Sequence, residues 1–327
     1  MSVDVHADWK HFLEQQGFEV TQVQGAARAR ARTHDADPAA TRCIDLNHFA
    51  ALTLLGPDAS SFLEGYLTCE MASLTEARAL QGAYCNIKGR VVADAIVLLL
   101  DAQPTLLLHA SLREEVVTSL RKYLAFSRSR FADADAAPVL LGIVNPPPAA
   151  GLPSEPLTVI AFRGGHAVAM PGTQARVLLL LPGAQAQAVW LEYAAQYRVG
   201  DAAIWDLLDV RDGIAHVDAS TSGTFLPQML DYDKAGAISF TKGCYLGQEI
   251  VARTQHLGRA KRHLHALQWS GAIAPSVGAA LADADNNKAG TVVAVAHTAP
   301  DRGEALAVLN DGSPSALYAG GATFVGV

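Results

Sequence analysis

The sequence predicts an α+β protein that ends in a small β-barrel. Segments that resemble strands and segments that resemble helices come in groups, without a regular βαβ repeat. After about residue 261, short apolar stretches alternate with Gly, Asp, Asn and Pro, as in small barrels. With 327 residues, half of them hydrophobic, the chain can bury a large core. We therefore expect a variable segment over 1–40, a main α+β domain over 41–260 and a barrel over 261–327.

Three segments of the first hundred residues have a clear local pattern. Residues 25–40 are rich in Ala and Arg and lack an apolar period, which predicts a mobile loop or tail. Residues 58–67 begin with an acid after a Gly-Pro pair, which predicts a short helix. Residues 90–100 are apolar and β-branched apart from Asp94, which predicts a buried strand with one polar interruption.

The middle of the chain adds a helix, a loop and a group of strands. Ser111 and Glu114 have the spacing of a capping box, which predicts a helix from there to about residue 126. The proline-rich residues 145–153 predict a surface loop. The strands expected next cover residues 157–162, 167–170 and 175–181, with a helix over 184–198. The expected barrel strands cover residues 262–269, 291–297, 304–309 and 322–327.

Composition and charge exclude several classes of protein. The first ten residues contain acids and no apolar core, and the apolar runs are too short to cross a bilayer, so we expect a cytoplasmic protein without a membrane partner. Four cysteines without C-x-x-C spacing fit a reducing compartment and form no evident metal site. A net charge of −7 does not favour direct nucleic-acid binding, so any RNA contact would have to be local.

The motifs of the common catalytic families are missing. The chain has no G-x-x-x-x-G-K-[ST], no G-x-G-x-x-G after a strand, no H-E-x-x-H and no G-x-S-x-G. His263 and His265 would share one strand face, but a metal site would need a third ligand that the sequence does not indicate. ATP-dependent, dinucleotide-dependent and zinc-hydrolase functions therefore lose support.

Residues 242–249, Lys-Gly-Cys-Tyr-Leu-Gly-Gln-Glu, concentrate more reactive groups than any other segment. A thiol reacts as the thiolate, and both Lys242 and a helix starting at about Gly247 would lower the pKa of Cys244. Gly243 and Gly247 would let a ligand approach the backbone closely. The alternative is a glycine-rich turn above an inert, buried cysteine.

The same segment offers groups that suit a flat, polar ligand. Tyr245 has a face on which a ring can stack, and Gln248 and Glu249 can pair with the edge of a heterocycle. So many useful groups in one short stretch favour a functional site.

Residues 242–253 resemble the signature of the YgfZ-type folate-binding proteins, which are relatives of the glycine-cleavage aminomethyltransferase. The resemblance covers the chain from about Cys43 to its end. Other matching segments are Phe-Leu-Glu-Gly-Tyr-Leu-Thr-Cys at 62–69, Tyr-Cys-Asn-Ile-Lys-Gly-Arg at 84–90, Lys-Tyr-Leu-Ala-Phe-Ser at 122–127, Thr-Ser-Gly-Thr-Phe-Leu-Pro-Gln at 221–228 and Ile-Ser-Phe at 238–240.

The resemblance implies an aminomethyltransferase-like fold, with two intertwined α+β subdomains around a central cavity and a C-terminal barrel. It implies binding of tetrahydrofolate or a one-carbon derivative. It further implies a role in the assembly or repair of iron–sulfur clusters in client proteins, one of which thiolates tRNA bases, so the link to tRNA modification would be indirect. We expect a monomer, and an acidic surface agrees with protein clients.

The resemblance also suggests roles for individual residues. Cys244, with Lys242, would be the reactive group. The predicted cofactor-binding residues are Tyr245, Gly247, Gln248, Glu249, Arg253, Asn86, Lys88, Arg90, Asp94 and Gln228.

Each of the outlying candidates also has a simpler interpretation. Arg253 could pair with Glu249 four residues earlier, Asn86 could cap its turn, and Asp94 could be a strand carboxylate that accepts backbone N–H groups. Lys88 and Arg90 could be solvated turn cations, and Gln228 could satisfy buried backbone groups.

Two other functions remain open. An aminomethyltransferase needs an acid or base beside the folate nitrogen, but Ala93 replaces one of two adjacent acids of that enzyme, and Arg211 stands where it has a pterin-binding acid. We therefore rank a folate-binding factor without this transfer activity first. The other possibility is a client-docking module whose folate cavity is vestigial.

Overall fold

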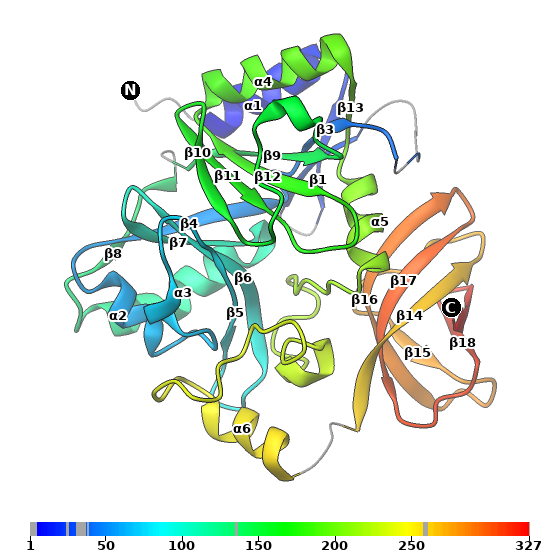
Figure 1. Ribbon diagram of the computed structural model, residues 1–327. Coiled ribbons are helices and arrows are strands. Elements are labelled where there is room, and N and C mark those ends of the chain that lie inside the picture. The colour runs from blue at the N-terminus through cyan, green and yellow to red at the C-terminus, as the bar shows by residue number, and fades with distance from the viewer. Residues whose placement is uncertain are drawn as a thin grey trace. The chain divides into compact units, whose positions relative to one another are not determined.

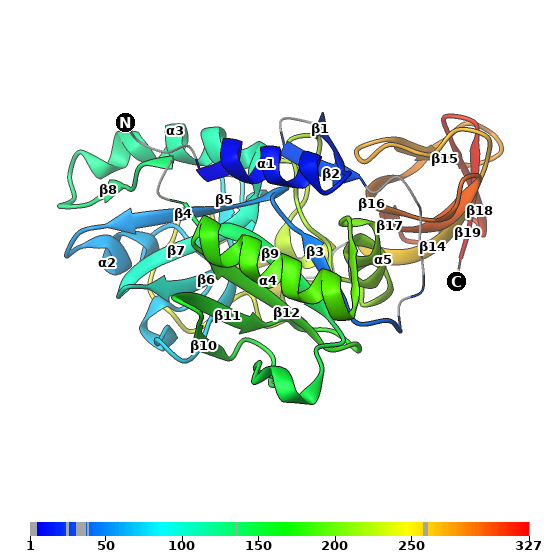
Figure 2. The same cartoon turned by 90° about the horizontal axis from the view of Figure 1, so that it is seen from above.

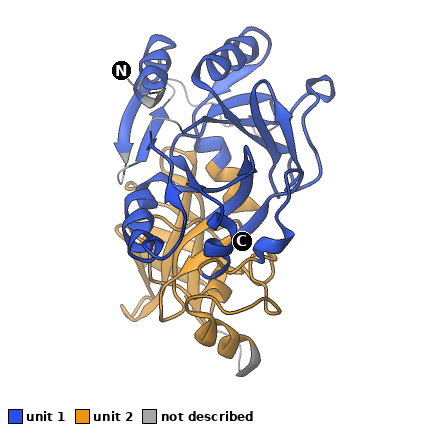
Figure 3. Cartoon of the chain, turned by 90° about the vertical axis from the view of Figure 1, so that its left-hand side faces the viewer, with its two compact units in different colours: residues 1–65, 70–81, 95–205 blue, residues 66–69, 82–94, 206–327 orange. Residues whose placement is uncertain are grey.

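The computed structural model describes residues 5–23, 26–30, 37, 39–134, 137–257 and 261–326 (Figure 1). The chain divides into two compact units, each built from segments that are distant in sequence (Figure 3). Unit 1 comprises residues 1–65, 70–81 and 95–205, and unit 2 comprises residues 66–69, 82–94 and 206–327. The chain passes between them within β5 (Leu80–Cys85), β6 (Val91–Leu100) and α5 (Ala203–Arg211).

The core of unit 1 lies between a six-stranded sheet and two helices. The sheet has the order β10-β11-β12-β9-β3-β13, and α1 and α4 lie side by side over one of its faces (Figures 1 and 2). Every residue of β9 and β12 is buried, which explains why both strands are apolar apart from Arg176. Trp9 of α1 packs edge-on against Trp190 of α4, with ring centroids 5.8 Å apart. The bounds are α1 Val5–Gln15, β3 Arg42–Asp45, β9 Val139–Val144, β10 Val159–Phe162, β11 Gly165–Ala169, β12 Arg176–Leu181, α4 Gly183–Gln196 and β13 Arg198–Gly200.

A second sheet has the order β5-β6-β7-β4-β8. α3 buries Val116, Leu120 and Leu124, which recur at the spacing of one helix face. The further elements are β4 Phe49–Leu55, α2 Ala59–Glu64, β7 Gln103–His109, α3 Arg113–Leu124 and β8 Arg130–Phe131.

Unit 2 contains a closed six-stranded barrel with the order β14-β17-β16-β15-β18-β19. Trp269 and Phe324 fill its interior, and the Trp269 indole N–H donates to the Ala296 carbonyl at 3.2 Å. The barrel confirms the predicted C-terminal architecture, and the mixed sheets and helices confirm the α+β class. The bounds are α6 Gln248–Leu257, β14 Arg262–Ser270, β15 Ala280–Ala282, β16 Lys288–Ala299, β17 Arg302–Asn310, β18 Ala316–Ala319 and β19 Ala322–Gly326.

Two local predictions are wrong. Ala26–Arg30, expected in a loop, form β2, which pairs antiparallel with β1 (Glu19–Val23) and buries Ala26 and Ala29. Of the rest of that predicted loop, residues 25, 31–36 and 38 lie outside the described residues, and residues 37, 39 and 40 belong to no helix or strand. The capping box is not formed, because the Ser111 hydroxyl contacts Nδ1 of His109 at 2.7 Å and α3 starts at Arg113 without a side-chain cap.

The proline-rich loop is confirmed, with one short 3-10 turn at Pro148–Ala150. Within the described part of the chain, no helix is long and apolar enough to cross a membrane.

Candidate functional site

All the predicted site residues lie in unit 2. The centre of the site is a contact between two glycine turns, the β5–β6 turn and the start of α6 (Figure 1). Gly247 has a φ of +84°, and a Cβ at this position would overlap the Asn86 carbonyl oxygen and come within 3.0 Å of the Cα of Gly89. Gly89 has a φ of +67°, and its own Cβ would lie 2.9 Å from the Cβ of Ile250. Both positions therefore require glycine.

Gly243 differs from Gly247. No atom lies within 4 Å of the position that its Cβ would occupy, and its φ is outside the left-handed region. Of the two glycines in the signature, only Gly247 is thus required by the local backbone.

The Asn86 side chain closes the β5–β6 turn. Its Oδ1 accepts hydrogen bonds from the backbone N–H groups of Lys88 at 2.9 Å and Arg90 at 3.2 Å. The Arg90 guanidinium donates to the Thr224 carbonyl. Lys88 is exposed at the tip of the turn. Asn86 and Arg90 therefore stabilise the turn that supports α6, and Lys88 extends into solvent.

Lys242 joins the signature to an earlier segment of unit 2. Its side chain is only 7% exposed, and Nζ donates to the carbonyl oxygens of Leu67 at 2.8 Å and Cys69 at 2.7 Å. The ammonium also lies 5.3 Å from the ring centroid of Tyr245. Charged donors make strong hydrogen bonds with buried carbonyls, so Lys242 anchors the loop that leads into α6.

Tyr245 lies inside the protein. Its burial raises the pKa of the phenol, and the nearby Cys85 adds to this effect. A stacking role would therefore involve only the accessible rim of the ring. Of the other two groups predicted to pair with a heterocycle, Gln248 is half-buried and Glu249 is exposed.

Cys244 is the accessible thiol of the chain. Its side chain is exposed, whereas Cys43, Cys69 and Cys85 are all buried. Burial raises the pKa of Cys85 to about 12, which keeps that thiol protonated and unreactive. Only Cys244 is thus presented to a reagent or partner.

Gln228 contacts the backbone of α6. Its Nε2 donates to the Val251 carbonyl at 2.8 Å. Its Oε1 is buried and accepts no hydrogen bond within the described residues. A buried acceptor without a hydrogen bond lowers the stability of the folded state, so this oxygen could accept a hydrogen bond from a ligand or a water molecule.

Asp94 takes part in a charged cluster that the sequence does not indicate. Its Oδ1 accepts the Val217 backbone N–H at 2.7 Å, and its Oδ2 lies 2.7 Å from Nδ1 of His216. Nε2 of His216 lies 3.6 Å from a carboxylate oxygen of Asp209. Burial lowers the pKa of His216, but the two carboxylates outweigh this effect and raise it to about 10. His216 is therefore an imidazolium at neutral pH.

Two arginines of the site have different surroundings. Arg211 forms a bidentate pair with Glu304, from Nη2 to Oε1 at 2.6 Å and from Nε to Oε2 at 3.1 Å, and this hydrogen bonding raises its pKa. Arg253 is exposed on α6, and among the ion pairs of the described chain there is none between it and Glu249. The intrahelical ion pair is therefore not formed in the structure, and the side chain of Arg253 is exposed.

Comparison with known proteins places this site in context. No family model matches the chain. It is 33% identical over 240 residues to the tRNA-modifying protein YgfZ of Colwellia psychrerythraea, which covers 69% of the chain and 71% of the relative. It is 30% identical over 288 residues to the protein of the same name from Klebsiella pneumoniae, and this alignment covers 84% of the chain and 87% of the relative.

The fold of this chain is also found among solved structures. The glycine cleavage system aminomethyltransferase T of Bartonella henselae superposes with a TM-score of 0.74, over 97% of this chain and 95% of that one. The two sequences are only 17% identical, so this likeness concerns the fold alone.

Proposed function

The chain belongs to the YgfZ family, and from this premise we propose that it is a tetrahydrofolate-binding factor that supports iron–sulfur cluster assembly or repair in client enzymes. Its contribution to tRNA modification, the activity for which its relatives are named, would pass through such clients. Cys244 would carry the chemistry.

The main observation behind this proposal is that Cys244 is exposed on a loop whose position is fixed. The thiol is exposed on a loop that is held on both sides, by the hydrogen bonds of Lys242 before it and by the packing of Gly247 after it. Functional groups on rigidly supported loops keep their position when a partner binds. The other three thiols are buried and so cannot take this role.

The residues around α6 suit a folate. Arg253 and Lys88 are exposed cations that would hold the carboxylates of the folate tail. The buried Gln228 Oε1 would accept a hydrogen bond from an N–H group of the pterin. A bound folate would supply a one-carbon unit or a reduced pterin next to the thiol.

The contacts of Asp94 argue against the aminomethyltransferase alternative. Both of its oxygens are already engaged, one by the Val217 N–H and one by the His216 imidazolium. A transferring acid or base has to be within hydrogen-bond reach of the folate nitrogen. Asp94 is instead positioned as a partner of His216, which supports the simpler interpretation of this residue.

Calorimetric titration with tetrahydrofolate under reducing, oxygen-free conditions tests the proposal. We expect saturable binding by the wild type and by Cys244→Ala, and weaker binding by Arg253→Gln than by the control Arg302→Gln, whose guanidinium is exposed in the barrel. Cys244→Ala should also fail to complement a strain that lacks its YgfZ-family protein. If neither the wild type nor Cys244→Ala binds tetrahydrofolate, the client-docking function is favoured instead. If Cys244→Ala complements fully, the thiol does not have the proposed role.

A further inference from the structure

The side chain of Phe126, in unit 1, is 93% exposed just after α3. A single apolar residue in solvent needs no explanation by itself. Two observations about its surroundings distinguish Phe126: the loop that carries it is fixed, and three cations without ion-pair partners among the described residues lie within five residues of it in the chain.

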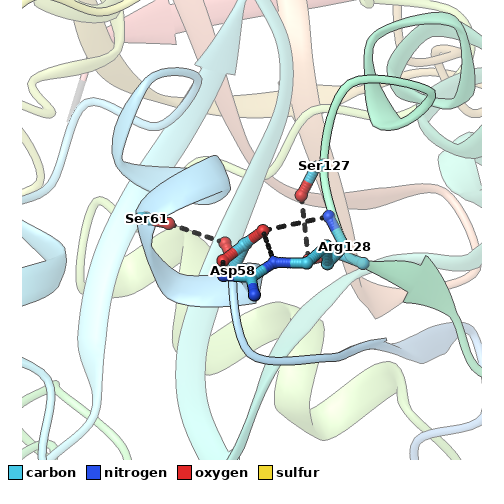
Figure 4. A network of polar contacts seen from close by, with 5 residues as sticks. Asp58, Ser61, Ser127 and Arg128 are labelled. Atoms are coloured by element: carbon cyan, nitrogen blue, oxygen red, sulfur yellow. Dashed lines mark hydrogen bonds and ion pairs between the residues drawn. The ribbon is translucent and has the colours of Figure 1, made fainter.

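The loop after α3 is held against the start of α2 (Figure 4). The backbone N–H and the guanidinium of Arg128 both donate to the carboxylate of Asp58, at 3.0, 2.9 and 2.8 Å. These hydrogen bonds lower the pKa of Asp58. Ser61 donates to the Asp58 carbonyl at 2.9 Å, and a Cβ on Gly56 would overlap the Arg128 carbonyl oxygen. Several contacts therefore determine the position of the loop, and with it the exposure of Phe126.

The helical path continues beyond the end of α3. Phe126 N donates to the Tyr123 carbonyl at 3.2 Å, and Ser127 N donates to the Leu124 carbonyl at 2.9 Å. These i→i−3 hydrogen bonds form a 3-10 turn, so Phe126 follows directly on the last turn of α3, which carries Lys122. The Lys122 ammonium lies over the ring of Tyr123, 4.9 Å from its centroid.

Three cations accompany the ring. Arg121, Lys122 and Arg130 are all exposed, and among the described residues none of them has an ion-pair partner. Arg128 differs, because Asp58 neutralises it. In a protein with a net charge of −7, these cations make the segment that carries Phe126 locally basic. We call Arg121, Lys122, Phe126 and Arg130 the α3 patch.

From this arrangement we propose that the α3 patch binds single-stranded RNA, with one base stacked on Phe126 and the neighbouring phosphates paired with the three cations. An open aromatic face beside a few cations is the combination that single-strand binders use. An anionic membrane would need a larger apolar face to insert, and the patch has only one large apolar side chain that is fully exposed. The site is local, as the charge of the chain requires, and it does not depend on folate binding.

Fluorescence anisotropy of a short, labelled single-stranded RNA with the full chain tests this proposal. We expect Phe126→Ala to weaken binding about 5- to 150-fold, the range that loss of one stacked base produces. Lys122→Gln should weaken binding and reduce the slope of log affinity against log salt by about 0.7, the value for one phosphate contact of a single strand.

Matched controls are available in the barrel. Ile273→Ala removes a side chain that is 67% exposed, and Lys288→Gln removes an exposed cation; both should bind as the wild type does. Because all four changes are at the surface, circular dichroism should show an unchanged fold. Loss of binding in the controls as well, or no RNA binding by the wild type, would overturn the proposal. Tighter binding of phosphatidylserine vesicles than of RNA, with the same dependence on Phe126, would assign the patch to a membrane instead. Tighter binding of polyglutamate, with the same dependence, would assign it to an acidic protein.

Discussion

Replacement of Gly247 by alanine should destabilise the junction between the signature helix and the β5–β6 turn. The φ of +84° is unfavourable for alanine, at a cost of about 1–2 kcal/mol. The new methyl group would also overlap the Asn86 carbonyl oxygen and approach the Cα of Gly89. These are backbone atoms that cannot rotate away, so overpacking adds roughly 1–3 kcal/mol. We expect a loss of about 2–5 kcal/mol in the free energy of unfolding.

Gly243→Ala is the matched control, four residues earlier in the same signature. Its φ is ordinary and nothing lies within 4 Å of the added methyl group, so the free energy of unfolding should stay equal or rise by about 0.4–1 kcal/mol. Urea unfolding gives both values from the shift of the midpoint at constant slope.

Hydrogen exchange locates the effect. The hydrogen bond from Gly89 N to the Asn86 carbonyl, 2.9 Å long, closes the turn that Gly247 touches. Its amide should exchange faster in Gly247→Ala and at the wild-type rate in Gly243→Ala. If the two variants unfold within about 0.5 kcal/mol of each other, the reasoning from the glycine contact is refuted.

Three further predictions concern the residues around this junction. His216 has its pKa raised to about 10, so its stabilising contribution is complete below its ordinary pKa of about 6.5 and is lost as the pH rises through 10. This contribution to the free energy of unfolding should be about 2–3 kcal/mol after allowance for partial exposure. The variant His216→Gln should no longer show this pH dependence in its unfolding midpoint. Lys242→Met leaves two buried carbonyls without their donor and should lower the free energy of unfolding by about 2–5 kcal/mol. The control Lys88→Met, at an exposed position, should change it by less than about 0.5 kcal/mol. Similar unfolding midpoints for the two variants would contradict the anchoring role of Lys242. Iodoacetamide should modify Cys244 alone in the native protein, as mass spectrometry can show, because the other three thiols are buried; modification of a second cysteine at a comparable rate would contradict the burial pattern.

Local patterns predicted the elements whose burial follows directly from their sequence. The run at 175–181 forms β12, whose residues are all buried, and the apolar stretches after residue 261 form a barrel. Prediction failed where a distant partner decides the structure. Ala26–Arg30 contain only Ala and Arg, yet they form a strand because β1 supplies hydrogen bonds to them. Ser111 has the spacing of a helix cap, but the neighbouring His109 takes its hydroxyl.

The same division applies to the site. The sequence by itself determined which segment carries the reactive thiol and where its helix begins, since a run of glycine, thiol, amide and acid is a local property. Only the tertiary structure decided that Cys244 is exposed, that Lys242 anchors the loop and that Asp94 holds an imidazolium. These features depend on contacts of residues 67–69 and 86–94 with residues 209–253, which are far apart from them in the chain. Their geometry is established only when the backbone folds and brings buried donors and acceptors together.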